Sequence, residues 1–197
     1  MQLNKQHTSS NYWAGNNPRS IMLHTTGGNS VVGATETLIA RGLSYNYLIK
    51  GATTYELVLY KKCAWHAGVV RGMNMRSKVF YGTGKGSENP NRHSVGIAFA
   101  TTSELTEEEV DQAVMLIKWL GSETGVRYNA DNIFYHREVT SDKPLIVKTF
   151  REQVLDALVG DKDDKDAGEK TVIRLTIQLL KLKVQLLHMQ LLGQRNK

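Results

Sequence analysis

The chain has a single cysteine, Cys63, among its 197 residues. One thiol cannot form an internal disulfide, so the fold has to be stable without covalent cross-links. This cysteine usage is typical of synthesis in a reducing compartment. Residues 1–17 are polar and lack the apolar centre of a signal peptide. We therefore expect a chain that is made in the cytoplasm without a signal peptide and would need another route out of the cell.

Long apolar runs and clusters of basic with aromatic residues are also missing. No uninterrupted apolar segment is long enough to span a bilayer. Basic and aromatic residues do not alternate as they do on many nucleic-acid surfaces, so we expect no nucleic-acid partner. The net charge is nevertheless +6 at neutral pH. An excess of positive charge favours an anionic partner, such as a membrane surface or a wall polymer.

The most informative stretch of the sequence surrounds His24. Three apolar residues precede His24 and Thr-Thr-Gly-Gly follows it. This pattern predicts a short buried strand that ends in a sharp turn. A second apolar run, within 132–135, ends at His136. Either histidine alone could be a core residue with an ordinary hydrogen bond, but two strand-end imidazoles from distant segments together predict a shared site.

The rest of the pattern predicts strands that alternate with helices. We expect a helix over 29–42, a hairpin of strands 45–50 and 55–60, and a surface loop over 72–92. A buried strand over 94–100, a helix that starts at the Thr106–Glu109 capping box and a helix over 144–159 follow. This alternation is typical of the α/β class, with a mixed central sheet flanked by helices.

The last part of the chain differs in composition. Residues 1–160 are predicted to form one core domain, and 161–170 are charged and read as a solvated linker. Residues 171–197 predict a C-terminal amphipathic helical tail, because their apolar residues recur at heptad spacing. The apolar face is wide, which favours self-association in a bundle. Docking on the chain's own core and contact with a membrane surface are the alternatives.

His24 and His136 are the first candidates for metal ligands. A catalytic zinc ion takes about three protein ligands and leaves one position for water. By residue type, the third ligand could be Glu138, Asp142 or Cys63. We favour Asp142, because it directly precedes the third predicted helix and can fold back toward His136. The alternative is that Asp142 only caps that helix.

Six segments resemble, in the family's order, the zinc-dependent N-acetylmuramoyl-L-alanine amidases of the type 2 fold. This family includes phage lysozyme-amidases and peptidoglycan recognition proteins. The segments are Ile21–Gly28, Ser44–Ile49, Trp65–Gly68, Asn91–Ile97, Leu105–Glu109 and Tyr135–Val139. The resemblance covers roughly 20–158 and implies a mixed sheet flanked by helices and a cleft with one zinc ion. It also implies hydrolysis of the amide between N-acetylmuramic acid and L-alanine in bacterial peptidoglycan.

The resemblance further implies roles for single residues. Tyr45 matches the position of a catalytic Tyr or Glu, and would hydrogen-bond the attacking water or the developing oxyanion. Lys143 would add positive charge there. The residues predicted to bind substrate are Thr26, Trp65, His66, Asn91 and His93. The alternatives are a sheet aromatic for Tyr45, core packing for Trp65 and a solvated turn residue for Lys143.

The function predicted from these observations is that of a phage endolysin. Such an enzyme is made in the host cytoplasm and acts on the cell wall after its release. The main alternative is a non-catalytic recognition module that binds peptidoglycan without cleaving it. A third reading is an oligomeric scaffold whose active part is the tail at 171–197.

Overall fold

The computed structural model describes residues 2–67, 89–138 and 146–160. The chain divides into two compact units, Met1–Leu158 and Val159–Lys197. The fold described below is that of the first unit. The predicted linker at 161–170 and the predicted helical tail at 171–197 lie outside the described residues.

A mixed five-stranded sheet forms the centre of the first unit, as the sequence predicts. Its strands lie in the order β4-β3-β6-β2-β7. They are β2 (Ser20–Thr25), β3 (Tyr47–Lys50), β4 (Thr53–Glu56), β6 (Ser94–Phe99) and β7 (Ile133–Tyr135). β2 runs parallel to β6 and β7, β3 runs parallel to β6, and β4 is antiparallel to β3. A separate two-stranded sheet pairs β1 (Tyr12–Trp13) with β5 (Cys63–Ala64).

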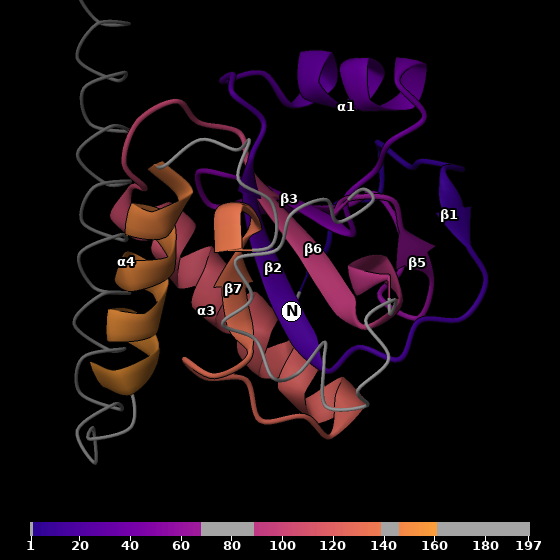
Figure 1. Ribbon diagram of the computed structural model, residues 1–197. Helices are drawn as coiled ribbons and strands as arrows, with labels where there is room; N and C mark the ends of the chain where they lie inside the picture. The colour runs from indigo at the N-terminus through magenta and orange to yellow at the C-terminus, as the bar shows by residue number, and fades with distance from the viewer. Residues whose placement is uncertain (1, 68–88, 139–145, 161–197) are drawn as a thin grey trace, which may run out of the picture. The chain divides into compact units, whose positions relative to one another are not determined.

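The two faces of the central sheet have different partners. Ile21 and Leu23 of β2 pack in the main core with α3 (Glu107–Thr124) and α4 (Ile146–Gly160). Figure 1 shows these two helices on the same side of the sheet, and α1 (Val31–Ala40) lies apart from them. Residues of α1 pack instead against a small cluster on the opposite face that includes Leu48 and Ala98. Because side chains alternate along a strand, His24 belongs to the α1 face.

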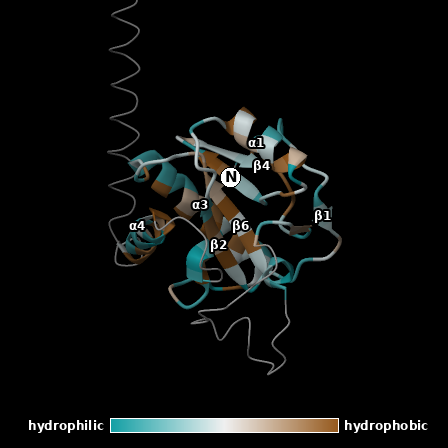
Figure 2. Cartoon of the chain, turned by 45° about the horizontal axis from the view of Figure 1, so that its top comes forward, coloured by the Kyte–Doolittle hydropathy of each residue, from teal (hydrophilic) through white to brown (hydrophobic). Residues whose placement is uncertain are grey.

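Hydropathy follows the same arrangement. Figure 2 shows hydrophobic residues concentrated on the central strands β2 and β6. All six residues of β6 are buried, as are the first five of β2. Strands that are covered on both faces are expected to be continuously apolar rather than alternating. This burial gives the site a rigid floor, because both central strands are held by ladder hydrogen bonds and by packing.

The predicted helix starts are confirmed where they can be compared. The capping box forms at the start of α3, where Thr106 Oγ1 accepts from the Glu109 backbone N–H and the Glu109 carboxylate accepts from that of Thr106. Ser30 caps α1, because its side-chain oxygen accepts from the Gly33 backbone N–H. The predicted third helix corresponds to α4, and the start that we expected at 144 lies outside the described residues.

The second strand of the predicted hairpin was wrong in its bounds. We expected 55–60, whereas β4 covers Thr53–Glu56. Gly51 adopts a left-handed conformation with φ of 52°, which allows a tighter turn than we expected. The chain then leaves the sheet, because the backbone N–H groups of Leu57 and Val58 both donate to the Asn46 carbonyl.

Two further boundaries differ from the expectation. β7 ends at Tyr135, and His136 begins the 3-10 helix η2 (His136–Glu138) instead of ending the strand. Within the loop expected at 72–92, residues 72–88 lie outside the described residues, and Pro90–Arg92 form the 3-10 helix η1 with a buried Asn91.

Within the described ranges, no helix combines the length and apolarity that crossing a membrane requires.

Candidate active site

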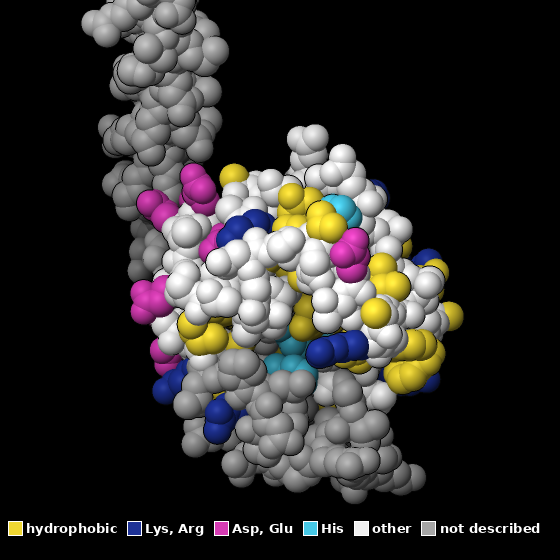
Figure 3. Space-filling model, turned by 90° about the horizontal axis from the view of Figure 1, so that it is seen from above, with side chains coloured by type: hydrophobic (Ala, Val, Ile, Leu, Met, Phe, Trp, Pro, Cys, Tyr) yellow, Lys and Arg dark blue, Asp and Glu magenta, His cyan; other side chains and the backbone are white. Residues whose placement is uncertain are grey.

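A cavity of about 720 Å³ opens between α1 and the carboxyl end of β2. Its lining includes the end of β2, the turn that follows, one face of α1, and single residues from several later segments. In the space-filling view, histidine atoms lie at the bottom of a hollow and a basic side chain lies beside them (Figure 3). The cavity therefore combines imidazole groups with an open path to solvent.

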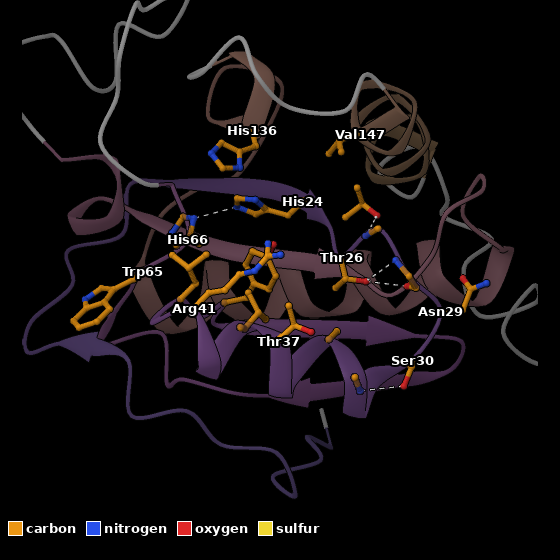
Figure 4. A pocket seen from close by; sticks show the side chains of 18 residues that line it. His24, Thr26, Asn29, Ser30, Thr37, Arg41, Trp65, His66, His136 and Val147 are labelled. Atoms are coloured by element: carbon orange, nitrogen blue, oxygen red, sulfur yellow. Dashed lines mark hydrogen bonds between the residues drawn. The ribbon is translucent and has the colours of Figure 1, made fainter.

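His24 and His136 meet in this cavity, as the sequence predicts. Their ring centroids are 4.5 Å apart and their planes are inclined by 72°. His24 is 2% exposed and His136 is 7% exposed. Figure 4 shows both rings on the same side of the sheet, with His66 close to His24. Two nitrogen ligands of one tetrahedral zinc ion lie about 3.3 Å apart, so rings at this spacing are compatible with one ion.

One nitrogen of each ring is engaged by the protein. His24 Nε2 lies 3.1 Å from His66 Nδ1. His136 Nε2 lies 3.2 Å from the Ala67 carbonyl oxygen, which can only accept, so His136 donates in this bond. Such bonds to the outer nitrogen are typical of metal-binding histidines, because they fix the ring orientation and the tautomer. The donor set of this pair therefore fits a zinc ion.

The third ligand proposed from the sequence, Asp142, lies outside the described residues. Among the residues that are described, no three His, Cys, Asp or Glu side chains form a group that could hold a metal ion. Glu138 is engaged elsewhere, because its carboxylate accepts from the Tyr135 backbone N–H at 2.9 Å and lies 3.8 Å from Arg151 Nε. Asp142 thus stays the proposed third ligand over Glu138.

Cys63 is also a poor alternative as the third ligand. It is fully buried in β5 and is not part of the cavity lining. Burial raises the pKa of its thiol to about 11. A metal ligand must be the thiolate, so this environment disfavours coordination.

Tyr45 lies next to His24 at the wall of the cavity. The two ring centroids are 4.8 Å apart. Burial raises the pKa of the Tyr45 phenol to about 12, so the hydroxyl keeps its proton at neutral pH. A protonated phenol in this place can donate a hydrogen bond to a water molecule or to an oxyanion. Lys143, its predicted partner in catalysis, lies outside the described residues.

Thr26 and Trp65, two of the predicted substrate-binding residues, line the cavity. The Thr26 hydroxyl donates to the Gly28 carbonyl at 2.9 Å and so holds the turn after β2. Trp65 is half-buried, and its ring packs against Trp13 with centroids 5.5 Å apart. An aromatic side chain at the end of a cavity can contact the apolar face of a sugar ring or a peptide.

The other three predicted substrate-binding residues are placed differently. His66 lines the cavity, but its two ring nitrogens face His24 and Ser94 inside the protein. Burial and the charge of His136 lower the pKa of His66 to about 3. Asn91 is buried, and its side-chain oxygen accepts from the backbone N–H groups of His66 and Ala67. His93 is not part of the cavity lining.

Sequence reasoning missed Arg41, which among the described residues is the only Lys, Arg, Asp or Glu side chain that lines the cavity. It is exposed and follows the last residue of α1. A signal for it was present, because Gly33, Thr37 and Arg41 recur every four residues and so lie on one helix face. That face of α1 forms one wall of the cavity.

Comparisons with known proteins agree with this geometry. A family model described as N-acetylmuramoyl-L-alanine amidase matches residues 14–144, which is more than half of the chain. No protein in the curated set matches the chain.

Several solved structures share the fold. A selenomethionine derivative of AmpD is 19% identical and superposes with a TM-score of 0.62, covering 80% of this chain and 99% of that one. A mutant endolysin from Bacillus subtilis is 18% identical, with a TM-score of 0.55 and coverage of 78% and 99%. The amidase AmiD from E. coli, in complex with its substrate anhydro-N-acetylmuramic acid-L-Ala-D-gamma-Glu-L-Lys, is 18% identical, with a TM-score of 0.56 and coverage of 74% and 58%.

Proposed function

Because the chain belongs to the N-acetylmuramoyl-L-alanine amidase family, we propose that it hydrolyses its amide with one zinc ion held by His24, His136 and Asp142. The observation that carries this proposal is the meeting of the two imidazoles in the cavity, with ring centroids 4.5 Å apart. The scissile bond is the amide between N-acetylmuramic acid and L-alanine of bacterial peptidoglycan.

The chain's own residues would prepare the amide for attack. A bound zinc ion would supply an acidified water and a Lewis acid for the carbonyl. Tyr45 keeps its phenolic proton, because its pKa is raised to about 12, and it would donate to the oxygen on which negative charge develops. Lys143 is proposed to add positive charge at the same place. The proposed roles of Tyr45 and Lys143 both require a donor that is fixed before the substrate arrives. Burial beside His24 fixes the Tyr45 side chain.

The remaining lining would hold the two sides of the substrate. Thr26 and Trp65, which line the cavity, are proposed to contact it. Arg41 would attract a carboxylate of the stem peptide. In the substrate bound by AmiD, the gamma linkage leaves the α-carboxylate of the glutamate outside the peptide bond, so this class of substrate carries a suitable anion. His66 and Asn91 would act through other residues and not by hydrogen bonds to substrate, since their polar atoms are bonded within the protein.

We propose that the biological role is that of an endolysin. The support is the fold shared with an endolysin from Bacillus subtilis and a basic chain suited to an anionic wall. The chain would be made in the host cytoplasm and act on the wall after release. Residues 171–197 are proposed to mediate self-association, with contact to a membrane surface as the second possibility.

The test combines metal analysis with the chemistry of the cleaved bond. Purified protein should contain about one zinc ion per chain, and it should release L-alanine amino groups from peptidoglycan. The variants His24→Ala and His136→Ala should lose both the zinc and the hydrolysis, because two ligands cannot retain a catalytic ion against a chelator. Elemental analysis after dialysis and a free-amine assay give the two readouts.

His7→Ala is the matched control, because His7 contacts Tyr55 with ring centroids 5.8 Å apart and is not part of the cavity lining. It should keep wild-type zinc content and activity. Full hydrolysis by a folded His24→Ala or His136→Ala protein would contradict the metal mechanism. Tight binding of peptidoglycan without release of amine would instead favour a recognition module.

A further inference from the structure

Ser94 begins a chain of hydrogen bonds that ends at His24. Ser94 is fully buried at the start of β6. Its Oγ lies 2.6 Å from the Pro90 carbonyl oxygen and 3.2 Å from His66 Nε2. On its other side, His66 Nδ1 lies 3.1 Å from His24 Nε2. These hydrogen bonds connect three side chains in one line: Ser94 of β6, His66, which follows β5, and His24 of β2.

The direction of every bond in this line follows from its first member. A carbonyl oxygen can only accept, so the single hydroxyl proton of Ser94 is donated to Pro90. Ser94 Oγ can then only accept from His66, which requires the proton of that ring to be on Nε2. A neutral imidazole has one ring proton, so His66 Nδ1 carries a lone pair and accepts from His24 Nε2.

The ring of His66 is held in place by close packing as well. A Cβ atom at Gly96 would lie only 2.6 Å from His66 Cγ, so the ring rests directly on the backbone of β6. The backbone N–H groups of His66 and Ala67 are both bound by the Asn91 side chain. A 180° turn of the ring would replace each nitrogen by a ring carbon, so this packing keeps Nε2 toward Ser94 and Nδ1 toward His24.

We propose that Ser94 is a positioning residue of the metal site, which acts through His66 to hold the tautomer in which His24 keeps its Nδ1 unprotonated for the metal. This inference rests on the proposed zinc function. Ser94 is not part of the cavity lining, so it would act through His66 and not by contact with substrate or metal. It selects which of the two imidazole nitrogens can be a ligand, and a histidine in the wrong tautomer presents an N–H group where the metal needs a lone pair.

The experiment reads the tautomers directly in the metal-free protein. Long-range proton–nitrogen NMR of the histidine side chains should find His66 protonated at Nε2 in the wild type. In Ser94→Ala the acceptor for this proton is lost, so His66 should shift toward the Nδ1–H form. The zinc dissociation constant, measured by competition with a chelator, should rise by about 10- to 100-fold in this variant.

Ser20→Ala is the matched control. Ser20 lies directly opposite Ser94 in the β2–β6 pair, is equally buried, and donates to the His93 carbonyl at 3.0 Å without touching a histidine ring. The Ser20→Ala variant loses a hydrogen bond to a backbone carbonyl, as Ser94→Ala does. Its His66 should keep the wild-type tautomer. Its zinc affinity should stay within about threefold of the wild-type value, because no partner of a metal-binding histidine is lost.

Two results would overturn the inference. One is a wild-type spectrum with His66 protonated at Nδ1, which decides the matter even if Ser94→Ala does not fold. The other is a folded Ser94→Ala protein with wild-type zinc affinity. Failure of the wild type to bind zinc is a different outcome, because it removes the proposed metal mechanism while the spectrum still reports the direction of the Ser94–His66–His24 bonds.

Discussion

At the scale of single residues, the described part of the site contains few charges. His24, His66 and His136 are nearly fully buried, and Arg41 is the only permanently charged side chain among the described residues that line the cavity. A cavity of this kind offers lone pairs to a metal and one positive charge to an anionic substrate. The histidines and the arginine therefore have separable functions, which substitutions can test one at a time.

Arg41→Gln tests the contact with the stem peptide. We expect kcat/KM to fall by about 1.4- to fivefold on a substrate with a free α-carboxylate, because exposed ion pairs contribute only about 0.2–1 kcal/mol. On a substrate in which that carboxylate is amidated, the variant and the wild type should be equal. Arg127→Gln, an exposed arginine outside the cavity lining, is the control and should change neither value. An equal loss on both substrates would mean that Arg41 does not recognise this group.

The stability of the metal-free protein should depend on pH through His66. Its folded-state pKa is lowered from 6.5 to about 3, mainly by burial. Between these values the unfolded chain binds a proton that the folded chain does not, so stability is fully present above pH 6.5 and is lost as the pH falls toward 3. One such group changes the free energy of unfolding by about 1.4 kcal/mol per pH unit within this range.

Denaturant unfolding of the wild type and of His66→Gln between pH 7 and pH 4 checks this expectation. Glutamine does not titrate, so the difference in unfolding free energy between the two proteins should shrink as the pH falls. The carboxylates titrate equally in both proteins and cancel in the difference. A difference that stays constant over this range would show that His66 becomes protonated in the folded state.

At the scale of elements, Asn46 connects the strand ends that surround the site. Its side-chain nitrogen donates to the carbonyls of Val58, Leu59 and Lys62, and its side-chain oxygen accepts from the Gly96 backbone N–H. Asn46 therefore binds β6 to the segment that follows β4. This residue directly follows Tyr45, so its anchoring also positions the proposed catalytic phenol.

Asn46→Ala should destabilise the protein by about 2–4 kcal/mol, because several buried backbone groups lose their partner and each costs about 1–3 kcal/mol when left unsatisfied. Thermal and denaturant unfolding give the value. Asn17→Ala, at an exposed position, should remain within about 0.5 kcal/mol of the wild type. A loss below 1 kcal/mol in Asn46→Ala would mean that water replaces the amide at this position.

The strand ends around the site also show what the sequence could and could not predict. The apolar run before His24 and the Thr106–Glu109 capping box are local patterns, and both predictions are confirmed. The end of β4 depends on Asn46, which lies ten residues from Glu56 and gives no local signal. Likewise the apolar run before His136 predicts its strand but not the 3-10 turn that turns the ring toward His24.

The pairing of His66 with Ser94 could not be predicted for a similar reason. The two residues are 28 positions apart and meet only because β6 passes beneath the segment that follows β5. From the sequence His66 was a candidate for contact with substrate, since an imidazole can donate to almost any polar group. The hydrogen bonds instead favour the role behind the metal site that we propose for it.

At the scale of the whole molecule, the positive charge is concentrated outside the amidase fold. Residues 171–197 contain five Lys and Arg and no Asp or Glu, which is five of the net charge of +6. The remaining 170 residues therefore carry 20 basic and 19 acidic side chains, a net charge of +1. Attraction to an anionic surface is consequently a property that we expect of the last 27 residues more than of the catalytic unit.

Deletion of 171–197 tests this division. We expect the shortened chain to keep its zinc and to hydrolyse a small soluble muropeptide at the wild-type rate, because the described residues that line the cavity all belong to the unit Met1–Leu158. Binding to anionic walls should weaken and become less dependent on salt. Light scattering on both chains should show a smaller assembly after the deletion. Loss of soluble-substrate hydrolysis by a folded, shortened chain would contradict this division.

The central claim, that His24 and His136 hold one catalytic zinc ion, is tested most directly by anomalous diffraction at the zinc absorption edge. The account predicts a single anomalous peak in the cavity, about 2.0–2.1 Å from one nitrogen of each ring, with Asp142 as the third ligand. An anomalous map from zinc-saturated crystals with no peak between the two rings would contradict it.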